Sequence, residues 1–148
     1  MRYRKVECAE VNLDELGLRQ KHADWLLVCG NTVIAVEETE HARLDDVEQL
    51  DQTLESCRSG ELQRVVRERV SGEPVSYYGV LHARSVGSMV VRALRARSRR
   101  KRVPIECASC DEEVARVIDR ILQRRPRRAA RLFRALPLNY LKAKVKYC

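Results

Sequence analysis

The chain has 148 residues, a hydrophobic share of 45% and a formal net charge of +8 at pH 7. This hydrophobic share is enough to bury the core of one ordinary domain, and it excludes an intrinsically disordered chain. No apolar run approaches the ~20 residues that a membrane span needs, and no secretory signal opens the sequence, so we expect a soluble, cytoplasmic protein.

The first predicted elements are a β-hairpin and two helices. Residues 23–28 and 32–37 are rich in Val, Leu and Ile, which favours strands, and a Cys-Gly-Asn turn joins them. Apolar side chains then recur at helical spacing over residues 44–57, and a shorter helix is predicted over 61–70. A Gly-Glu-Pro sequence ends that second helix.

The next elements alternate between strand and helix. Residues 75–82 predict a third strand, and residues 86–98 predict a helix for which Ser85 is a suitable N-cap. Residues 103–107 predict a short strand, and its proline favours a position at the edge of a sheet.

Ser109 and Glu112 match a capping box, which predicts the start of the strongest helix in the chain. Pro126 ends or kinks this helix, and another helix is predicted over 127–136. The helix has an apolar stripe that can pack on the core or on a second copy of the chain in a homodimer. The stripe comprises Val114, Val117, Ile118, Ile121 and Leu122.

These elements together predict an α/β (α+β) fold. A small mixed sheet of about four strands would pack with about four to five helices in a single domain, because sheets and amphipathic helices must bury their apolar faces against one another. No low-complexity linker or internal repeat divides the chain.

Positive and negative residues are segregated along the sequence. Residues 1–74 contain 10 Lys and Arg against 16 Asp and Glu, whereas residues 75–148 contain 19 against 5, so the net charges are −6 and +14. Solubility does not require such an acidic N-terminal half and strongly basic C-terminal half. Clustered positive charge attracts phosphates and indicates nucleic acid as the partner, although an acidic protein would fit the same surface.

The basic residues are densest over residues 92–102, where seven of eleven are cationic and none is acidic. Three of them share one face of the predicted helix, because residues three and four apart are neighbours on a helix. These are Arg92, Arg95 and Arg99, and the run continues in the following loop with Arg100, Lys101 and Arg102. Like charges so close together destabilise a helix unless a polyanion is near, so we expect this surface to bind phosphates.

A second set of arginines lies on the last predicted helices. Its members alternate with apolar residues, which is typical of any solvated helix, so the set is weaker support for a binding surface. It comprises Arg116, Arg120, Arg124, Arg127, Arg128, Arg131 and Arg134.

Binding to single strands also requires platforms on which bases stack. Tyr77 and Tyr78 are adjacent on a predicted strand, so their side chains point to opposite faces, and one can be exposed while the other is buried. Arg84 near the end of that strand can stack on bases as well, whereas Trp25 is expected in the core. No helix-turn-helix or zinc-finger spacing is present, which favours binding independent of base sequence.

Two carboxylates, Asp24 and Glu37, lie thirteen residues apart at the ends of the paired hairpin strands. The surrounding segment, residues 22–82, resembles the core of the PD-(D/E)XK nucleases. This resemblance implies that Asp24 and Glu37 hold Mg²⁺ and that a Lys two residues after the Glu activates water. Thr39 occupies the lysine position here, and Lys21 is only a remote substitute. Alternatively, the acidic residues border a hairpin and favour the N-terminus of the next helix.

Six cysteines are present: Cys8, Cys29, Cys57, Cys107, Cys110 and Cys148. Without a secretion signal they are expected to be buried thiols or metal ligands, but intracellular disulfides occur in hyperthermophiles, and the Arg-rich composition is compatible with such a source. One or two disulfides can form, with a pairing that the sequence leaves open. The single CxxC at residues 107–110 provides only two of the four ligands of a structural zinc, so no cofactor is expected.

Three sequence features can be compared with known families: the Cys29-Gly30-Asn31 hairpin, the Arg92–Arg102 cluster and the Tyr77-Tyr78 strand. In these features, in its size and in its order of elements, the chain is similar to the ThermoDBP-related single-stranded DNA-binding proteins of hyperthermophilic archaea. This resemblance implies a non-enzymatic protein that binds single-stranded DNA. Its basic run would neutralise phosphates, and Tyr77 or Tyr78 would stack on bases. A Mg²⁺-dependent nuclease and a structural protein that docks an acidic partner remain as alternatives.

Overall fold

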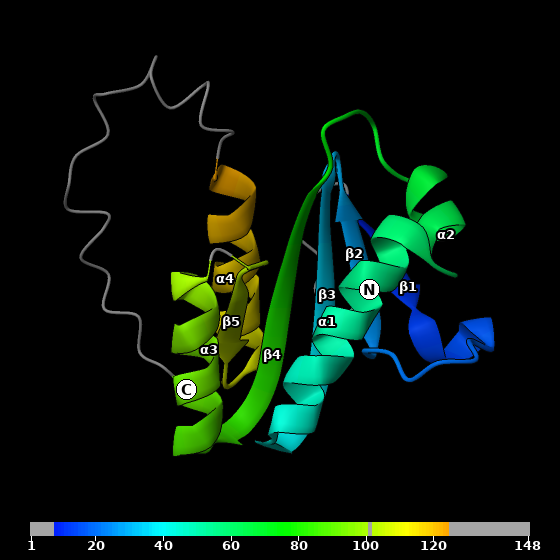
Figure 1. The fold of residues 1–148 in the computed structure, drawn as a ribbon. Helices are drawn as coiled ribbons and strands as arrows, with labels where there is room; N and C mark the ends of the chain where they lie inside the picture. The colour runs from blue at the N-terminus through cyan, green and yellow to red at the C-terminus, as the bar shows by residue number, and fades with distance from the viewer. Residues whose placement is uncertain (1–7, 101, 125–148) are drawn as a thin grey trace, which may run out of the picture.

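A five-stranded mixed sheet forms the centre of the molecule, and its strands lie side by side in chain order (Figure 1). The computed structural model describes residues 8–100 and 102–124. β1, β2 and β3 are antiparallel neighbours, whereas β3, β4 and β5 are parallel. The strands are β1 (Cys8–Asn12), β2 (Trp25–Cys29), β3 (Thr32–Ala42), β4 (Ser76–Val86) and β5 (Ile105–Ala108).

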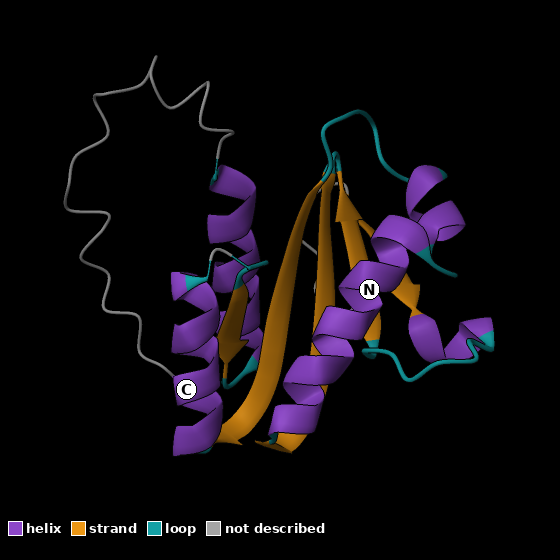
Figure 2. Ribbon diagram, viewed as in Figure 1, coloured by secondary structure: helices purple, strands orange, loops and turns teal. Residues whose placement is uncertain are grey.

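Helices cover both faces of the sheet (Figure 2). Within the described ranges they are α1 (Leu44–Ser59), α2 (Gln63–Arg67), α3 (Ser88–Arg99) and α4 (Asp111–Gln123), and a 3-10 turn, η1 (Leu13–Leu16), follows β1. α1 and α3 connect parallel strands in the same direction across the sheet, so a common right-handedness places both helices on one face. α4 follows the last strand and packs on the opposite face.

Alternate residues of β3 contribute to the two halves of the core. Val33 and Ala35 pack with α1 and α3, while Ile34 and Val36 pack with α4. Because helices cover both faces of this strand, its sequence is apolar at every one of these positions. The predicted α/β (α+β) class, with helices packed on a small mixed sheet in one domain, is confirmed.

The ends of several strands differ from the prediction. β1 was missed, because five residues with Val11 as the one fully buried side chain carry no clear alternation. β3 and β4 extend further than expected and pair with each other as far as Ala42 and Val86. Ser85 therefore belongs to a strand, and the N-cap of α3 is Gly87. The residues of these extensions are polar and do not resemble a buried strand. The apolar pattern that predicted β3 and β4 therefore ended before the strands themselves do.

The start of α4 also differs from the predicted capping box. Cys110 is the N-cap residue, and Glu113 rather than Glu112 accepts hydrogen bonds from the backbone N–H and the hydroxyl of Ser109, both at 2.7 Å. The short strand β5 does lie at the edge of the sheet, as the proline before it predicted.

Four of the five residues of the predicted apolar stripe of α4 are buried against the sheet, whereas Leu122 is exposed because it lies at the edge of the stripe. Val114, Val117, Ile118 and Ile121 belong to the core cluster on that face, so a homodimer would have to use another surface. The helix predicted over 127–136 lies outside the described residues. Over residues 8–100 and 102–124 the structure contains no helix that is long and apolar enough to cross a membrane.

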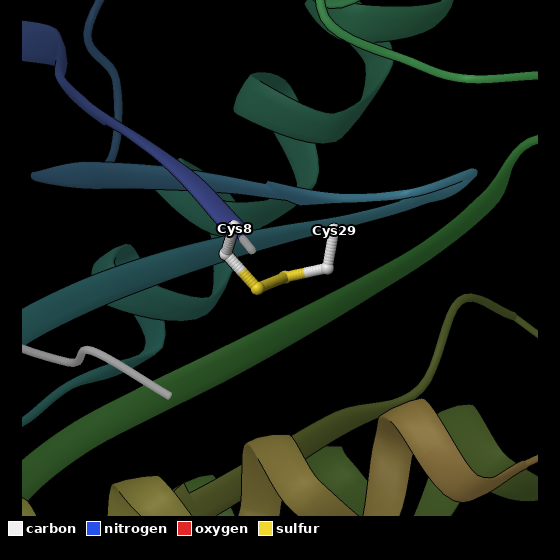
Figure 3. Close-up of a disulfide and its surroundings, with 2 residues drawn as sticks. All are labelled: Cys8 and Cys29. Carbon is white, nitrogen blue, oxygen red and sulfur yellow. A yellow bond between two sulfur atoms is a disulfide. The ribbon is translucent and has the colours of Figure 1, made fainter. Parts of the chain in front are cut away.

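A disulfide joins the first two strands through Cys8 and Cys29 (Figure 3). These residues are direct partners in the antiparallel register, which brings their Cα atoms to 4.3 Å. One bridge is within the one or two that the sequence allowed, and Cys57 and Cys110 are free thiols. Because β1 is an edge strand with one neighbour, the bridge is its second attachment to the sheet.

Replacement of both Cys8 and Cys29 by Ser should lower the free energy of unfolding by about 3 kcal/mol, since the bridge closes a loop with a sequence separation of 21. Chemical denaturation followed by circular dichroism measures the change. Cys110→Ser is the matched control, because Cys110 is an exposed free thiol. Equal stability of the double variant and the wild type under oxidising conditions would contradict a stabilising bridge.

Candidate nucleic-acid interface and carboxylate pair

The outer face of α3 carries the predicted arginine row. Arg92, Arg95 and Arg99 are exposed, whereas Val90 and Leu94 of the same helix are buried. The expectation that these three arginines share a solvent face is therefore confirmed. Arg100 and Arg102 continue the exposed surface beyond the helix, and Lys101 lies outside the described residues.

Several other arginines of the described chain form ion pairs. Arg84 pairs with Glu40 across β3 and β4, with 3.1 Å between nitrogen and oxygen. In the second predicted set, Arg116 pairs with Glu112, and both Arg120 and Arg124 pair with Glu106. These carboxylates offset much of the local positive charge, which weakens the second set as a binding surface. Its remaining members lie beyond the described residues.

Four arginines along α3 and just beyond it differ from those. They form no ion pair with any side chain that the structure describes, and all four are exposed. The four are Arg92, Arg99, Arg100 and Arg102. Because no described carboxylate neutralises them, this surface is a local source of positive potential.

Arg97 belongs to the same basic run but is buried, with 8% of its surface exposed. Its guanidinium is paired with Asp51 of α1 and donates a hydrogen bond of 2.9 Å to the carbonyl of Val103. Of the described cationic residues of the run, five are exposed, and Arg97 attaches α3 to α1.

An open groove of about 470 Å³ lies between α1 and the segment that connects α3 to β5. Three arginines line it, two of which are exposed and one of which is the buried Arg97. The lining residues are Asp51, Gln52, Leu54, Glu55, Arg58, Arg97, Arg102 and Val103. Sequence reasoning missed Arg58 and Asp51, because nothing in the acidic half signals which of its residues meet the basic run.

The two adjacent tyrosines point to opposite faces of the sheet, as predicted. Tyr77 packs on the core beside α1 and lies under the guanidinium of Arg58, whose central carbon is 4.9 Å from the ring centroid. Tyr78 packs on the core beside α4 and lies under Arg124 at 5.6 Å. Both rings are half-buried, and burial raises the pKa of the Tyr77 hydroxyl. Trp25 is also half-buried against the α4 core.

The register of the first hairpin brings the two predicted carboxylates together. Trp25 pairs with Val36, so the next residues along the two strands, Asp24 and Glu37, lie beside each other at the end of the ladder. Asp24 is held in place by its own backbone N–H, which donates to the carbonyl of Val36 at 3.1 Å. Its carboxylate accepts a hydrogen bond of 2.7 Å from the backbone N–H of Glu38.

Glu37 is the buried member of this pair, with 6% of its surface exposed. The side-chain amide of Gln49 on α1 donates to Oε1 at 3.4 Å, while Oε2 has no hydrogen-bond partner among the described residues. Burial, followed by the charges of Asp24 and Asp46, raises the pKa of Glu37 to about 8. Burial also raises the pKa of Asp24.

These two carboxylates fit a divalent cation in donor type, since oxygen ligands suit Mg²⁺. The rest of a nuclease site is not assembled around them. Thr39 stands where the resemblance expects lysine, and the alternative Lys21 is an exposed loop residue. Elsewhere in the described chain no three His, Cys, Asp or Glu side chains are grouped to hold a metal, so a cation would have Asp24, Glu37 and water as ligands.

The CxxC cysteines are not arranged as a pair. Cys107 packs on the core beside α1, whereas Cys110 is an exposed residue at the N-cap of α4. Cys57 is deeply buried, and burial raises the pKa of its thiol to about 12, which keeps it protonated and unreactive.

Comparison with protein-family models, with curated proteins and with solved structures found no match for this chain. Its function is therefore inferred from its own side chains.

Glu37→Gln should remove a pH dependence of stability. The pKa of Glu37 lies at about 8 in the folded protein and near 4.5 without burial, so the folded state binds the proton more tightly than the unfolded state. The contribution of Glu37 to the free energy of unfolding is complete at pH values below its pKa in the unfolded state. This contribution falls as the pH rises toward the folded-state pKa of about 8. Thermal unfolding over a series of pH values, in buffer with a chelator, measures this pH dependence. Glu48→Gln, at an exposed position on α1, is the control. A wild-type profile as flat as that of Glu37→Gln would contradict the buried acid.

Proposed function

We propose that the protein binds nucleic acid through the outer face of α3 and the residues that follow it, independently of base sequence and with a preference for single-stranded DNA. The observation that carries this proposal is the group of four exposed arginines along α3 and in the residues that follow it, none of which has a carboxylate partner in the described chain. Such a group is costly in an isolated protein, because neighbouring like charges destabilise a helix. A bound polyanion removes this cost.

The proposed binding is mainly electrostatic. Arginine guanidinium groups bind phosphate oxygens in a bidentate manner and also stack on bases. Arg92, Arg95 and Arg99 would contact phosphates along α3, and Arg100, Lys101 and Arg102 would extend the path. Tyr77, Tyr78 and Arg84 would contribute stacking, although each tyrosine ring already has one face under a guanidinium.

An acidic protein would also meet this surface, as the alternative partner. Nucleic acid is favoured because arginines dominate the group, and their planar donors match phosphates arranged in a row. A protein that binds only acidic proteins would show no affinity for any oligonucleotide at low salt.

Charge reversal of Arg92 and Arg99 to Glu should weaken oligonucleotide binding at least tenfold and equally for all sequences, because phosphates carry no sequence information. The dependence of affinity on salt should also become shallower, since fewer counterions are released. Fluorescence anisotropy over a series of salt concentrations measures both effects.

The matched control for this test is the reversal of Arg64 and Arg67 on α2, two exposed arginines that give the same change in net charge. If both double variants lose the same affinity, net charge alone is responsible and α3 is not the interface. A loss confined to one oligonucleotide sequence would instead indicate base readout.

A second candidate function, a Mg²⁺-dependent nuclease, is favoured by the adjacent carboxylates Asp24 and Glu37 and by the raised pKa of Glu37. A bound cation would offset the repulsion between these acids and could polarise a phosphate. Under this reading the arginines of α3 hold the substrate.

Cleavage of a labelled single strand in the presence of Mg²⁺ would establish the nuclease, provided that Asp24→Asn abolishes it while binding in chelator is unchanged. We expect intact oligonucleotide in both cases, because no lysine stands near the carboxylates in the position that the nuclease resemblance requires. Cleavage that persists in Asp24→Asn would point to a contaminating enzyme.

A further inference from the structure

We infer that the groove between α1 and the α3–β5 connection holds one unpaired nucleotide of the bound strand, with its base against Arg58. This inference rests on the proposed function and deepens it, because it assigns the part of the molecule that distinguishes single strands from duplexes. The groove volume of about 470 Å³ lies in the range of pockets that enclose small ligands, roughly 300–1,000 Å³.

The charges of the groove match those of one phosphodiester unit. Arg58, Arg97 and Arg102 contribute three positive charges, and Asp51 and Glu55 contribute two negative ones. The ion pair between Asp51 and Arg97 cancels two of these charges inside the wall, which leaves two exposed arginines opposite one carboxylate. The remaining charge of +1 complements the single negative charge of a phosphodiester.

The buried Arg97 fixes one wall of the groove. Two of its nitrogens are hydrogen-bonded, one to the carboxylate of Asp51 and one to the carbonyl of Val103. These bonds join α1, α3 and the connection to β5 around the groove, so its lining keeps one arrangement.

Arg58 is held in a position that suits base stacking. Its guanidinium lies over the Tyr77 ring at 4.9 Å from the centroid, and the same side chain lines the groove. Planar guanidinium groups stack on bases. The half-buried Val103 contributes apolar surface to the same groove, and a base can pack on it.

The groove is continuous with the arginine face of α3. Arg99 and Arg100 end the helix, and Arg102 lies two residues further along the chain and already lines the groove. A strand whose phosphates follow α3 thus reaches the groove without a break in positive charge. A base in a duplex cannot enter it, because its partner base would have to enter with it.

The test compares an intact single-stranded oligonucleotide, an abasic strand of the same length and a fully paired duplex, each by fluorescence anisotropy. The wild type should bind the intact strand about tenfold more tightly than the abasic strand, as expected for the stacking of one base. Arg58→Ala should reduce this ratio severalfold, with the remainder due to stacking on Tyr77, Tyr78 or Arg84, and should leave duplex binding unchanged. Arg64→Ala, also an exposed arginine on a neighbouring helix, is the control and should keep the wild-type ratio.

Two results would overturn the inference while leaving the proposed function intact. One is equal binding of the intact and abasic strands by the wild type, which would mean that no base is held. The other is a tenfold ratio that survives in Arg58→Ala, which would place the base elsewhere. A nucleoside monophosphate that binds as tightly as the oligonucleotide would instead contradict the proposed function, since α3 would then contribute nothing. If no oligonucleotide binds the wild type, the proposed function itself fails.

Discussion

The buried ion pair between Arg97 and Asp51 determines where the basic surface of this protein lies. Arg97 follows Val90 and Leu94 at helical spacing, so it turns inward with them, and the other arginines of α3 must turn outward. A buried charge that loses its partner destabilises a protein strongly. This pair therefore holds α3 against α1, and the groove between them keeps its shape because both partners are needed in the core.

The pairing of β3 with β4 brings acidic residues of the first half of the chain next to basic residues of the second half. Because these strands are parallel and long, acidic residues of the first half meet basic residues of the second, as in the pair of Glu40 with Arg84. Asp51 on α1 meets Arg97 in the same way. These pairs cancel part of the asymmetry inside the fold. The arginines along α3 and just beyond it, apart from Arg97, remain exposed at the surface.

Local patterns predicted the elements better than their contacts. The hairpin of β2 and β3 and the helices α1 and α4 follow from apolar periodicity and turn residues, which act within a few positions of each other. β1 was missed because its stability comes from its partner strand and from the bridge of Cys8 to Cys29, neither of which is visible locally. The groove was missed for the same reason. Arg58 and Arg102 are far apart in sequence, and only the packing of α3 on α1 brings them to one site.

The two candidate sites lie at opposite ends of α1, and the charges along this helix separate them. Asp46, near Glu37, is twelve residues from Arg58 in the groove, or about 18 Å at the helical rise of 1.5 Å per residue. A strand held in the groove would need several further nucleotides to reach the carboxylates. The first turn of α1 carries Asp45 and Asp46, which repel a polyanion, whereas Arg58 in the last turn attracts it. Binding in the groove therefore does not depend on Asp24 and Glu37. Cleavage would depend both on the groove and on a cation that reverses the charge at the far end of the helix.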